Sequence, residues 1–383
     1  MRNSVRKPIA IDLFCGCGGL TLAFTEADYN VILGIDTDDS ALHTYEKDFG
    51  NTMTLNLDLS AAEALNRVHE AIGKREVDVI IAGPPCQGFS LTGPRKFDDA
   101  RNRLYLSVIK AVQGLNPKSF IIENVPGLAT LYNGQIKDEI VRRFTSLNYN
   151  VSYKILNAAD FGVPQIRRRF FLVGLRPEFG HFEFPVPTHS PGNYTTCSDA
   201  ISDLPSRENE PGKEVDIYDK EPNTQYQRMM RGDCSILYNH VATNHTEMVR
   251  NVIALVPEGG NYKDLPPGVG DSRRFHVAWT RYHSAKPCST IDTGHRNHFH
   301  YKYNRIPTVR ENARLQSFPD RFVFYGNRTQ QNRHVGNAVP PLLGFHLAKE
   351  ILKHIVPDKD YANRHRLDPT AIRNNQLSFK FRR

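Results

Sequence analysis

The chain has 383 residues, of which 39% are hydrophobic and 23% are charged, and its formal net charge is +8 at pH 7. These fractions are ordinary for a folded soluble protein. Single hydrophobic cores stop growing near about 250–300 residues, so we expect two domains. No apolar run approaches the ~20 residues of a membrane span, and the first eight residues lack the apolar stretch of a signal peptide. We therefore expect a cytoplasmic protein with no membrane partner.

The basic balance, with a pI near 9.1, favours a polyanionic partner but supports nucleic acid only weakly by itself. The six cysteines form no CxxC pair and have no Cys/His spacing typical of structural zinc. They are Cys15, Cys17, Cys86, Cys197, Cys234 and Cys288. We expect reduced, unpaired thiols and no metal site.

Short β-rich runs alternate with helix-length amphipathic segments from residue 8 to about 176. The runs are residues 9–14, 30–35, 53–57, 77–82, 119–122, 151–156 and 170–174. This alternation predicts an α/β fold with a doubly wound, mostly parallel sheet. After about Pro177 the chain is rich in Pro, Gly, Asn, Asp and His with few periodic stretches, which predicts a second, smaller and loop-rich domain.

A glycine-rich turn follows the first run. Such a turn lets the backbone approach a ligand closely at a helix N-terminus. It contains Phe14, Gly16, Gly18 and Gly19. Thr21 replaces the third glycine of a dinucleotide fingerprint, which disfavours an NAD site, and a merely structural turn is the alternative. Asp36 ends the second run at the spacing of a carboxylate that accepts both ribose hydroxyls, and Asp58 could reach an adenine amino group or form an N-cap.

One thiol stands directly after a buried run that cannot continue. Residues 77–82 are apolar, and Pro84 and Pro85 end any strand before Cys86. Ligands of open α/β sheets bind at the carboxyl ends of the strands, so the position suggests a nucleophile. A small buried hydrophobe is the plain alternative for a lone cysteine.

Six blocks in order then resemble the cytosine-C5 DNA methyltransferases of bacterial restriction-modification systems. They are residues 12–19 (DLFCGCGG), 84–87 (PPCQ), 123–125 (ENV), 165–169 (QIRRR), 310–320 (RENARLQSFPD) and 336–340 (GNAVP). The resemblance implies an S-adenosylmethionine-dependent, Rossmann-like catalytic and cofactor domain at 1–187 and a target-recognition domain at 188–304. It further implies a hinge at 305–331 and a segment at 332–383 that returns to the catalytic domain.

The resemblance also implies roles for single residues. Cys86 would add to C6 of a flipped-out cytosine, and Glu123 would donate to ring N3. Arg167 and Arg169 alternate along the chain, so on a strand they would share one face and reach the cleft, where an arginine can hold base O2 and lower the thiol pKa. Arg168 is expected to face phosphate or solvent. The implied cofactor residues are Phe14, Gly16, Gly18, Gly19, Asp36, Asp58, Pro84, Asn337 and Val339.

The remaining expectations concern DNA. Polar residues 87–103 suggest a lid or a surface loop, with Gln87, Ser90 and Arg95 as contacts. Arg281 and Arg296 lie among histidines and aromatic residues of the types that contact grooves and phosphates. A metal site at His295, His298 and His300 is disfavoured, because no thiol is near. The acidic residues within 206–223 are expected in a solvated loop that faces away from DNA.

The preferred hypothesis is thus a monomeric enzyme that methylates C5 of cytosine in a short duplex DNA sequence, with a cognate restriction endonuclease as a possible further partner. Three alternatives stay open at this point. They are a transfer-RNA cytosine methyltransferase, a catalytically silent DNA-binding relative and a dehydrogenase. The sequence does not reveal the target site.

Overall fold

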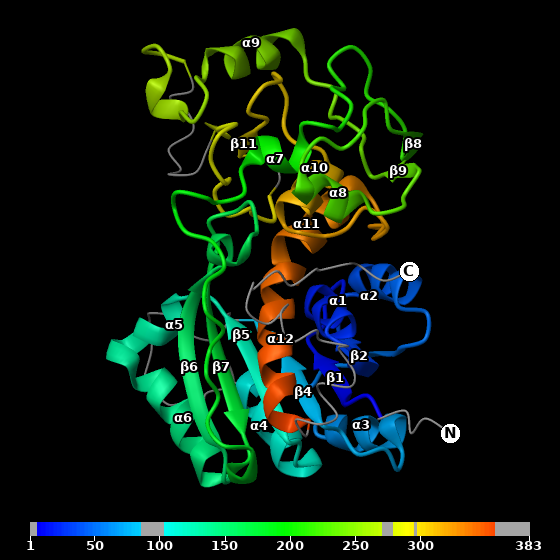
Figure 1. Cartoon of the computed structure of the whole chain (residues 1–383), viewed down its shortest axis with the longest axis vertical. Coiled ribbons are helices and arrows are strands. Elements are labelled where there is room, and N and C mark those ends of the chain that lie inside the picture. The colour runs from blue at the N-terminus through cyan, green and yellow to red at the C-terminus, as the bar shows by residue number, and fades with distance from the viewer. Residues whose placement is uncertain (1–5, 86–102, 270–278, 295–296, 357–383) are drawn as a thin grey trace, which may run out of the picture. The chain divides into compact units, whose positions relative to one another are not determined.

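The computed structural model describes residues 6–85, 103–269, 279–294 and 297–356, and these form two compact units (Figure 1). The first unit draws on Met1–Asn157, Arg168–Val186 and Leu343–Ser378. The second draws on Ala158–Arg167, Pro187–Leu342 and Phe379–Arg383. Within the described ranges, no helix is long and apolar enough to cross a membrane.

The first unit contains a seven-stranded sheet in the order β3-β2-β1-β4-β5-β7-β6. Its strands are β1 (Ile9–Leu13), β2 (Asn30–Asp36), β3 (Met53–Asn56), β4 (Val79–Ala82), β5 (Ser119–Asn124), β6 (Asn150–Asn157) and β7 (Arg168–Leu175). The first five are parallel, while β7 runs antiparallel to both β5 and β6. All seven runs expected from the sequence are strands, so the prediction of a mostly parallel sheet is confirmed.

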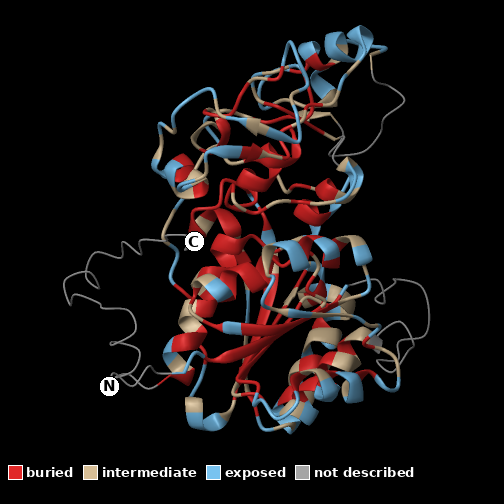
Figure 2. Ribbon diagram, turned by 90° about the vertical axis from the view of Figure 1, so that its right-hand side faces the viewer, coloured by how far each residue is buried: buried red, intermediate tan, exposed pale blue. Residues whose placement is uncertain are grey.

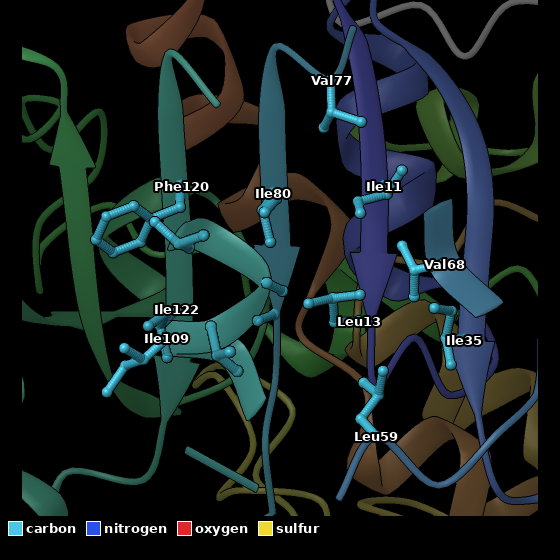
Figure 3. Close-up of a cluster of buried hydrophobic side chains, with 14 of the residues drawn as sticks. Ile11, Leu13, Ile35, Leu59, Val68, Val77, Ile80, Ile109, Phe120 and Ile122 are labelled. Atoms are coloured by element: carbon cyan, nitrogen blue, oxygen red, sulfur yellow. The ribbon is translucent and has the colours of Figure 1, made fainter. Parts of the chain in front are cut away.

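Helices cover the sheet because its central strands are apolar on both faces. All residues of β1 and β4 are buried, as parallel strands require (Figure 2). The helices of this unit are α1 (Gly19–Glu26), α2 (Asp39–Asp48), α3 (Ala64–Ile72), α4 (Arg103–Leu115), α5 (Gly127–Thr130), α6 (Gln135–Ser146) and α12 (Pro341–Ile355), which begins two residues before the unit boundary. One core cluster joins strand residues to α3, α4 and α6, and Val68, Ile80 and Ile109 are among its members (Figure 3).

The last described helix, α12, packs against the first, α1. A Cβ added at Gly344 would lie 2.7 Å from the Cβ of Ala23, so the two helices approach too closely there for a larger residue. The Tyr29 hydroxyl donates a hydrogen bond to the Ala348 carbonyl oxygen. Residues from opposite ends of the chain therefore share one core in the first unit.

The second unit is loop-rich, as expected. Its helices are α7 (Cys197–Ile201), α8 (Gln225–Arg231), α9 (Glu247–Leu255), α10 (Val309–Leu315) and α11 (Arg328–Asn337), and its strands are β8 (Val215–Ile217), β9 (Ile236–Tyr238), β10 (Thr280–Arg281) and β11 (His298–Phe299). The unit includes Ala158–Arg167 and continues to Leu342, which differs from the domain limits expected at 187/188 and 331/332. The two units are defined by their packing alone, so the predicted catalytic and target-recognition domains remain a prediction.

Buried ion pairs stabilise the second unit where apolar periodicity is missing. Arg314 on α10 lies 2.5 Å from Asp203 and 2.6 Å from Asp320, and all three side chains are fully buried. The pairing holds the pKa of Asp320 near 2 although burial alone would raise it. Removal of one partner from such a pair leaves an uncompensated buried charge, so these three side chains strongly constrain the packing of the second unit.

A glycine in β7 provides a test of the packing. Gly174 pairs with Phe120 on β5, and a Cβ at Gly174 would lie 2.1 Å from the Phe120 ring. That ring packs at a tilt against the Phe144 ring, with centroids 4.2 Å apart, and cannot easily move. We expect Gly174→Ala to lower the free energy of unfolding by about 1–3 kcal/mol, measured by urea denaturation. Gly127→Ala is the matched control, because a Cβ there meets nothing within 4 Å; equal stability of the two variants would contradict the packing argument.

Candidate active site

The turn after β1 is held by a carboxylate from the end of β2. The main-chain N–H of Gly16 donates to Asp36 at 2.8 Å, and the N–H groups of Thr37 and Asp38 donate to the other Asp36 oxygen. A carboxylate has about four acceptor positions, so roughly one stays available for a ligand hydroxyl. Asp36 is thus a loop anchor as well as a candidate ligand acceptor, and it can accept both ribose hydroxyls only if one of these bonds is exchanged.

Backbone conformation leaves open space at this turn. Phe14 has φ +64° and Gly16 has φ +54°, and Gly18, the N-cap of α1, has φ +98°. A Cβ at Gly16 would meet no atom within 4 Å. At Gly18 it would lie 2.3 Å from the Phe49 ring, so this position is closed by packing. Gly16 is therefore the glycine beside which a ligand has room, while Gly18 and the buried Gly19 shape the turn.

A buried carboxyl group lies on β1, just before this turn. Asp12 on β1 accepts a hydrogen bond from the Thr21 hydroxyl at 2.7 Å, and Thr21 also contacts the Tyr45 hydroxyl at 3.0 Å. Burial, with a smaller contribution from nearby Asp36, raises the pKa of Asp12 from 3.8 to about 7. Thr21 stands where a dinucleotide fingerprint would have its third glycine, and its hydroxyl is the hydrogen-bond partner of this carboxyl.

Burial makes several thiols poor nucleophiles. It raises the pKa of Cys15 and Cys17 in the turn, and of Cys234 and Cys288 in the second unit. A thiol must ionise before it attacks an electrophile. These four residues are therefore unsuited to the nucleophile's role that the sequence assigned to Cys86, which lies outside the described residues.

The segment leading to Cys86 is anchored to the end of β5. The Asn124 side chain donates to the Pro84 carbonyl oxygen at 2.9 Å and accepts from the Val125 N–H at 2.8 Å. Pro84, expected to bind cofactor, is itself buried. Asn124 was missed as a site residue, although its amide stands next to Glu123 in a strand that ends at the ligand edge of the sheet.

Glu123 and Arg169 form an ion pair at this edge. The two residues lie on the antiparallel strands β5 and β7, diagonally across from each other on one face. The distance between Arg169 Nε and Glu123 Oε1 is 3.0 Å, and both side chains are about 15% exposed or less. The other Glu123 oxygen would lie 3.8 Å from a Cβ at Gly83, just after β4. Burial lowers the pKa of Arg169, and Glu123 opposes that shift.

Arg167 does not share this arrangement, which corrects the expectation that it shares a strand face with Arg169. β7 begins at Arg168, and the Ala158 N–H donates to the Arg167 carbonyl oxygen at 2.9 Å just before it. The Arg167 side chain is buried, and its guanidinium donates to carbonyl oxygens of Ile291, Gly336 and Ala338. It therefore contacts main-chain oxygens of the second unit, to which Arg167 itself belongs. Arg168 is exposed, as expected.

The other predicted cofactor residues have mixed surroundings. Asp58 is exposed, and its carboxylate accepts from the Ser60 N–H at 2.8 Å, so it forms a turn; the N-cap of α3 is Glu63. In the second unit, Asn337 ends α11 with its side chain exposed, and Val339 is buried.

Arg281 was expected to contact DNA, and its surroundings argue against that role. The side chain is buried, and its nitrogens donate to carbonyl oxygens of Ile253, Val256 and His300. Arg281 therefore joins loops of the second unit, and its donors are directed to main-chain oxygens. His298 and His300 are also buried, with lowered pKa values, about 3 for His300, because burial disfavours the charged ring.

No group of three or more potential metal ligands occurs among the described residues. The acidic loop at 206–223 is mostly exposed, except that Arg207 is buried and pairs with Glu210 and Asp216. Four further expected DNA contacts lie outside the described residues. They are Gln87, Ser90, Arg95 and Arg296.

Comparison with known proteins gives consistent matches along the chain. The family model described as C-5 cytosine-specific DNA methylase matches residues 9–353. The type II methyltransferase M1.HphI of Haemophilus parahaemolyticus is 39% identical over 350 residues, which cover 90% of this chain and 86% of that protein. M.DdeI of Desulfomicrobium norvegicum, also a type II methyltransferase, is 38% identical over 366 residues, with 89% and 88% covered.

Solved structures share the fold. One is a prophage-encoded protein of E. coli described as a DNA modification methyltransferase, with a TM-score of 0.76, 26% identity and coverage of 91% of this chain and 99% of that one. The S. pombe Dnmt2 methyltransferase has a TM-score of 0.60 at 17% identity, with 91% and 99% covered, and shows the fold alone.

The raised pKa of Asp12 predicts a stability change with pH. The folded form holds its proton up to about pH 7, whereas the unfolded form releases it near pH 3.8. The stabilisation from that proton is complete below pH 3.8 and is lost as pH rises to 7. The unaltered chain should therefore lose about 1.4 kcal/mol of unfolding free energy per pH unit between these values. Asp12→Asn has no carboxyl group to titrate, so its unfolding free energy minus that of the unaltered chain should rise by the same amount. Urea denaturation at several pH values measures it, and a difference independent of pH would refute the assignment.

Proposed function

Because this chain belongs to the family of C-5 cytosine-specific DNA methylases, we propose that it methylates C5 of a flipped-out cytosine in a short duplex DNA sequence, with S-adenosylmethionine as methyl donor and through a covalent Cys86 adduct. The family membership makes it a cytosine-C5 DNA methyltransferase. The observation that carries the finer proposal is the Glu123–Arg169 pair, which lies beside the strand end that leads to Cys86.

The turn after β1 fits S-adenosylmethionine in two respects. Gly16 provides open space at the start of a helix, where main-chain N–H groups favour a carboxylate such as that of the methionine moiety. Asp36 has acceptor capacity for a ribose hydroxyl at the end of the next strand. When bound, S-adenosylmethionine supplies an electrophilic methyl group. Phe14, Gly18 and Gly19 shape the turn in the proposal. Asn337, the last residue of α11, and Val339 are the further residues proposed to contact the cofactor.

The reaction begins at Cys86. Its thiolate adds to C6 of the cytosine, and the electrons of the C5–C6 double bond move so that C5 becomes nucleophilic and takes the methyl group. Glu123 donates a proton to N3 and so stabilises the charge that enters the ring. Loss of the C5 proton to water then restores the C5–C6 double bond and expels the Cys86 thiolate, and the N3 proton returns to Glu123. Arg169 would donate to base O2 from its place beside Glu123.

Glu123 must carry a proton for this step, yet its ion pair with Arg169 favours the charged carboxylate. Entry of the base resolves the conflict in this proposal. Base O2 takes up part of the hydrogen-bonding capacity of Arg169, and the ring excludes water from Glu123. Both changes favour the protonated carboxyl, so the donor form arises with the substrate in place.

The curated relatives are type II methyltransferases, which supports a role in a restriction-modification system with a cognate endonuclease. One monomer carries all residues that the mechanism needs. The alternative substrate is transfer RNA, and the alternative role is a silent DNA-binding relative. The retained Glu123–Arg169 pair disfavours the silent relative, because binding alone gives no reason to keep it.

The first experiment maps 5-methylcytosine base by base in a methylation-free bacterial host. We expect methylation at one short motif with the intact chain and none with Cys86→Ala, since no thiolate can then activate C5. Cys234→Ala, a partly exposed cysteine of the second unit, should leave the map unchanged. Methylation that survives Cys86→Ala would refute the adduct, and unmodified DNA with labelled RNA would favour the alternative substrate.

A second experiment isolates Glu123. Glu123→Gln keeps the shape of the side chain but cannot protonate N3, so single-turnover methyl transfer should slow by at least about 100-fold, while the Kd of S-adenosylmethionine stays within about twofold. The matched control is Glu178→Gln, which breaks another Glu–Arg pair of the first unit, to Arg176 at 3.1 Å. Equal rates for the two variants would remove Glu123 from the mechanism.

A further inference from the structure

The helix α11 ends in a sequence that cannot complete its own hydrogen bonds. Carbonyl oxygens in the last turn of a helix need donors from outside it. Pro340 and Pro341 stand four residues after Gly336 and Asn337 and have no N–H. The N–H of Leu342, four residues after Ala338, donates instead to the Ser317 hydroxyl at 3.1 Å.

Arg167 supplies the missing donors from a distant part of the sequence. Its Nη2 donates to the Gly336 carbonyl at 2.8 Å and to the Ala338 carbonyl at 3.1 Å, on either side of Asn337. Its Nη1 donates to the Ile291 carbonyl at 3.3 Å. A cation at the C-terminus of a helix is also favoured by the helix dipole.

Two further contacts hold the same turn. The Gln316 side chain donates to the Ala338 carbonyl at 2.5 Å. A Cβ at Gly336 would lie only 2.6 Å from the Asp292 carbonyl oxygen, so the backbone of α11 touches the backbone of residues 292–293 directly. Close backbone contact leaves little freedom, and the Arg167 hydrogen bonds then fix the orientation of the turn that presents Asn337 and Val339.

We propose that Arg167 is a positioning residue, which caps α11 and thereby fixes Asn337 and Val339 for S-adenosylmethionine. This inference rests on the proposed function and replaces the role of Arg167 as a direct contact to the cytosine. A buried guanidinium is costly unless its donors are used, and here Nη1 and Nη2 donate to main-chain oxygens within the second unit. The geometry thus points to an effect of Arg167 on cofactor affinity first and on the chemical step second.

The test compares Arg167→Lys with Arg168→Lys, a matched control on the exposed neighbouring residue. Lysine keeps the charge but cannot span three carbonyl oxygens with a planar fork. We expect the Kd of S-adenosylmethionine, measured by calorimetry without DNA, to rise at least tenfold in Arg167→Lys and less than twofold in Arg168→Lys. The KM for DNA should change less than threefold. Hydrogen exchange without cofactor should quicken in residues 335–342 of Arg167→Lys only.

Gln316→Met removes the other donor to the Ala338 carbonyl and should weaken cofactor binding in the same direction. An unchanged Kd in folded Arg167→Lys with a lower kcat would overturn the proposal in favour of a direct contact to the base. Loss of the fold in both variants would also overturn it, because Arg167 and Gln316 would then be general structural residues. An unaltered chain that binds S-adenosylmethionine but methylates no DNA would refute the proposed substrate and leave the assignment of Arg167 standing.

Discussion

The hydrogen bond from the Gly16 N–H to the Asp36 carboxylate fixes the turn after β1 against the end of β2. A chain that leaves a parallel sheet loses the ladder partners of its main-chain groups, and each buried group needs a replacement. Asn124 performs the same task for Pro84 at the neighbouring strand ends. Asp36 and Asn124 therefore hold the loops at the carboxyl ends of the strands. Substituting either residue is expected to shift its loop and, with it, the proposed ligand site.

The same constraint explains why the number of arginines in the second unit overstates its positive surface. Six arginines in the described part of this unit are buried, and their guanidinium groups bind carbonyl oxygens or carboxylates. They are Arg167, Arg207, Arg281, Arg305, Arg310 and Arg314. A guanidinium buried in this way is not presented to a phosphate at the surface. Surface attraction to DNA must then come from other basic residues, so residue type and spacing alone could not identify the contacts.

The sequence predicted the sheet well because its signals were local: apolar runs of strand length, bounded by Gly, Pro and Asp. The same pattern marks where strands end, so the sequence also placed Glu123 correctly at the end of β5. It did not anticipate the surroundings of Arg167, whose guanidinium donates to the carbonyl oxygens of Gly336 and Ala338. It missed Asn124 and misjudged Arg281 because burial and hydrogen-bond partners depend on segments far away in sequence.

In the proposed mechanism Arg169 serves two acceptors in turn, Glu123 and base O2, and its surroundings suit that role. A fully exposed arginine would be held by water, and a pair as buried as Arg314 and Asp320 would not exchange partners readily. The Glu123–Arg169 pair lies between these limits, largely buried but still open at the edge of the sheet. Burial lowers the pKa of Arg169 without neutralising it. In the proposed mechanism such a pair is stable before the base enters and can still yield one hydrogen bond to it, as the proposed protonation of N3 by Glu123 requires.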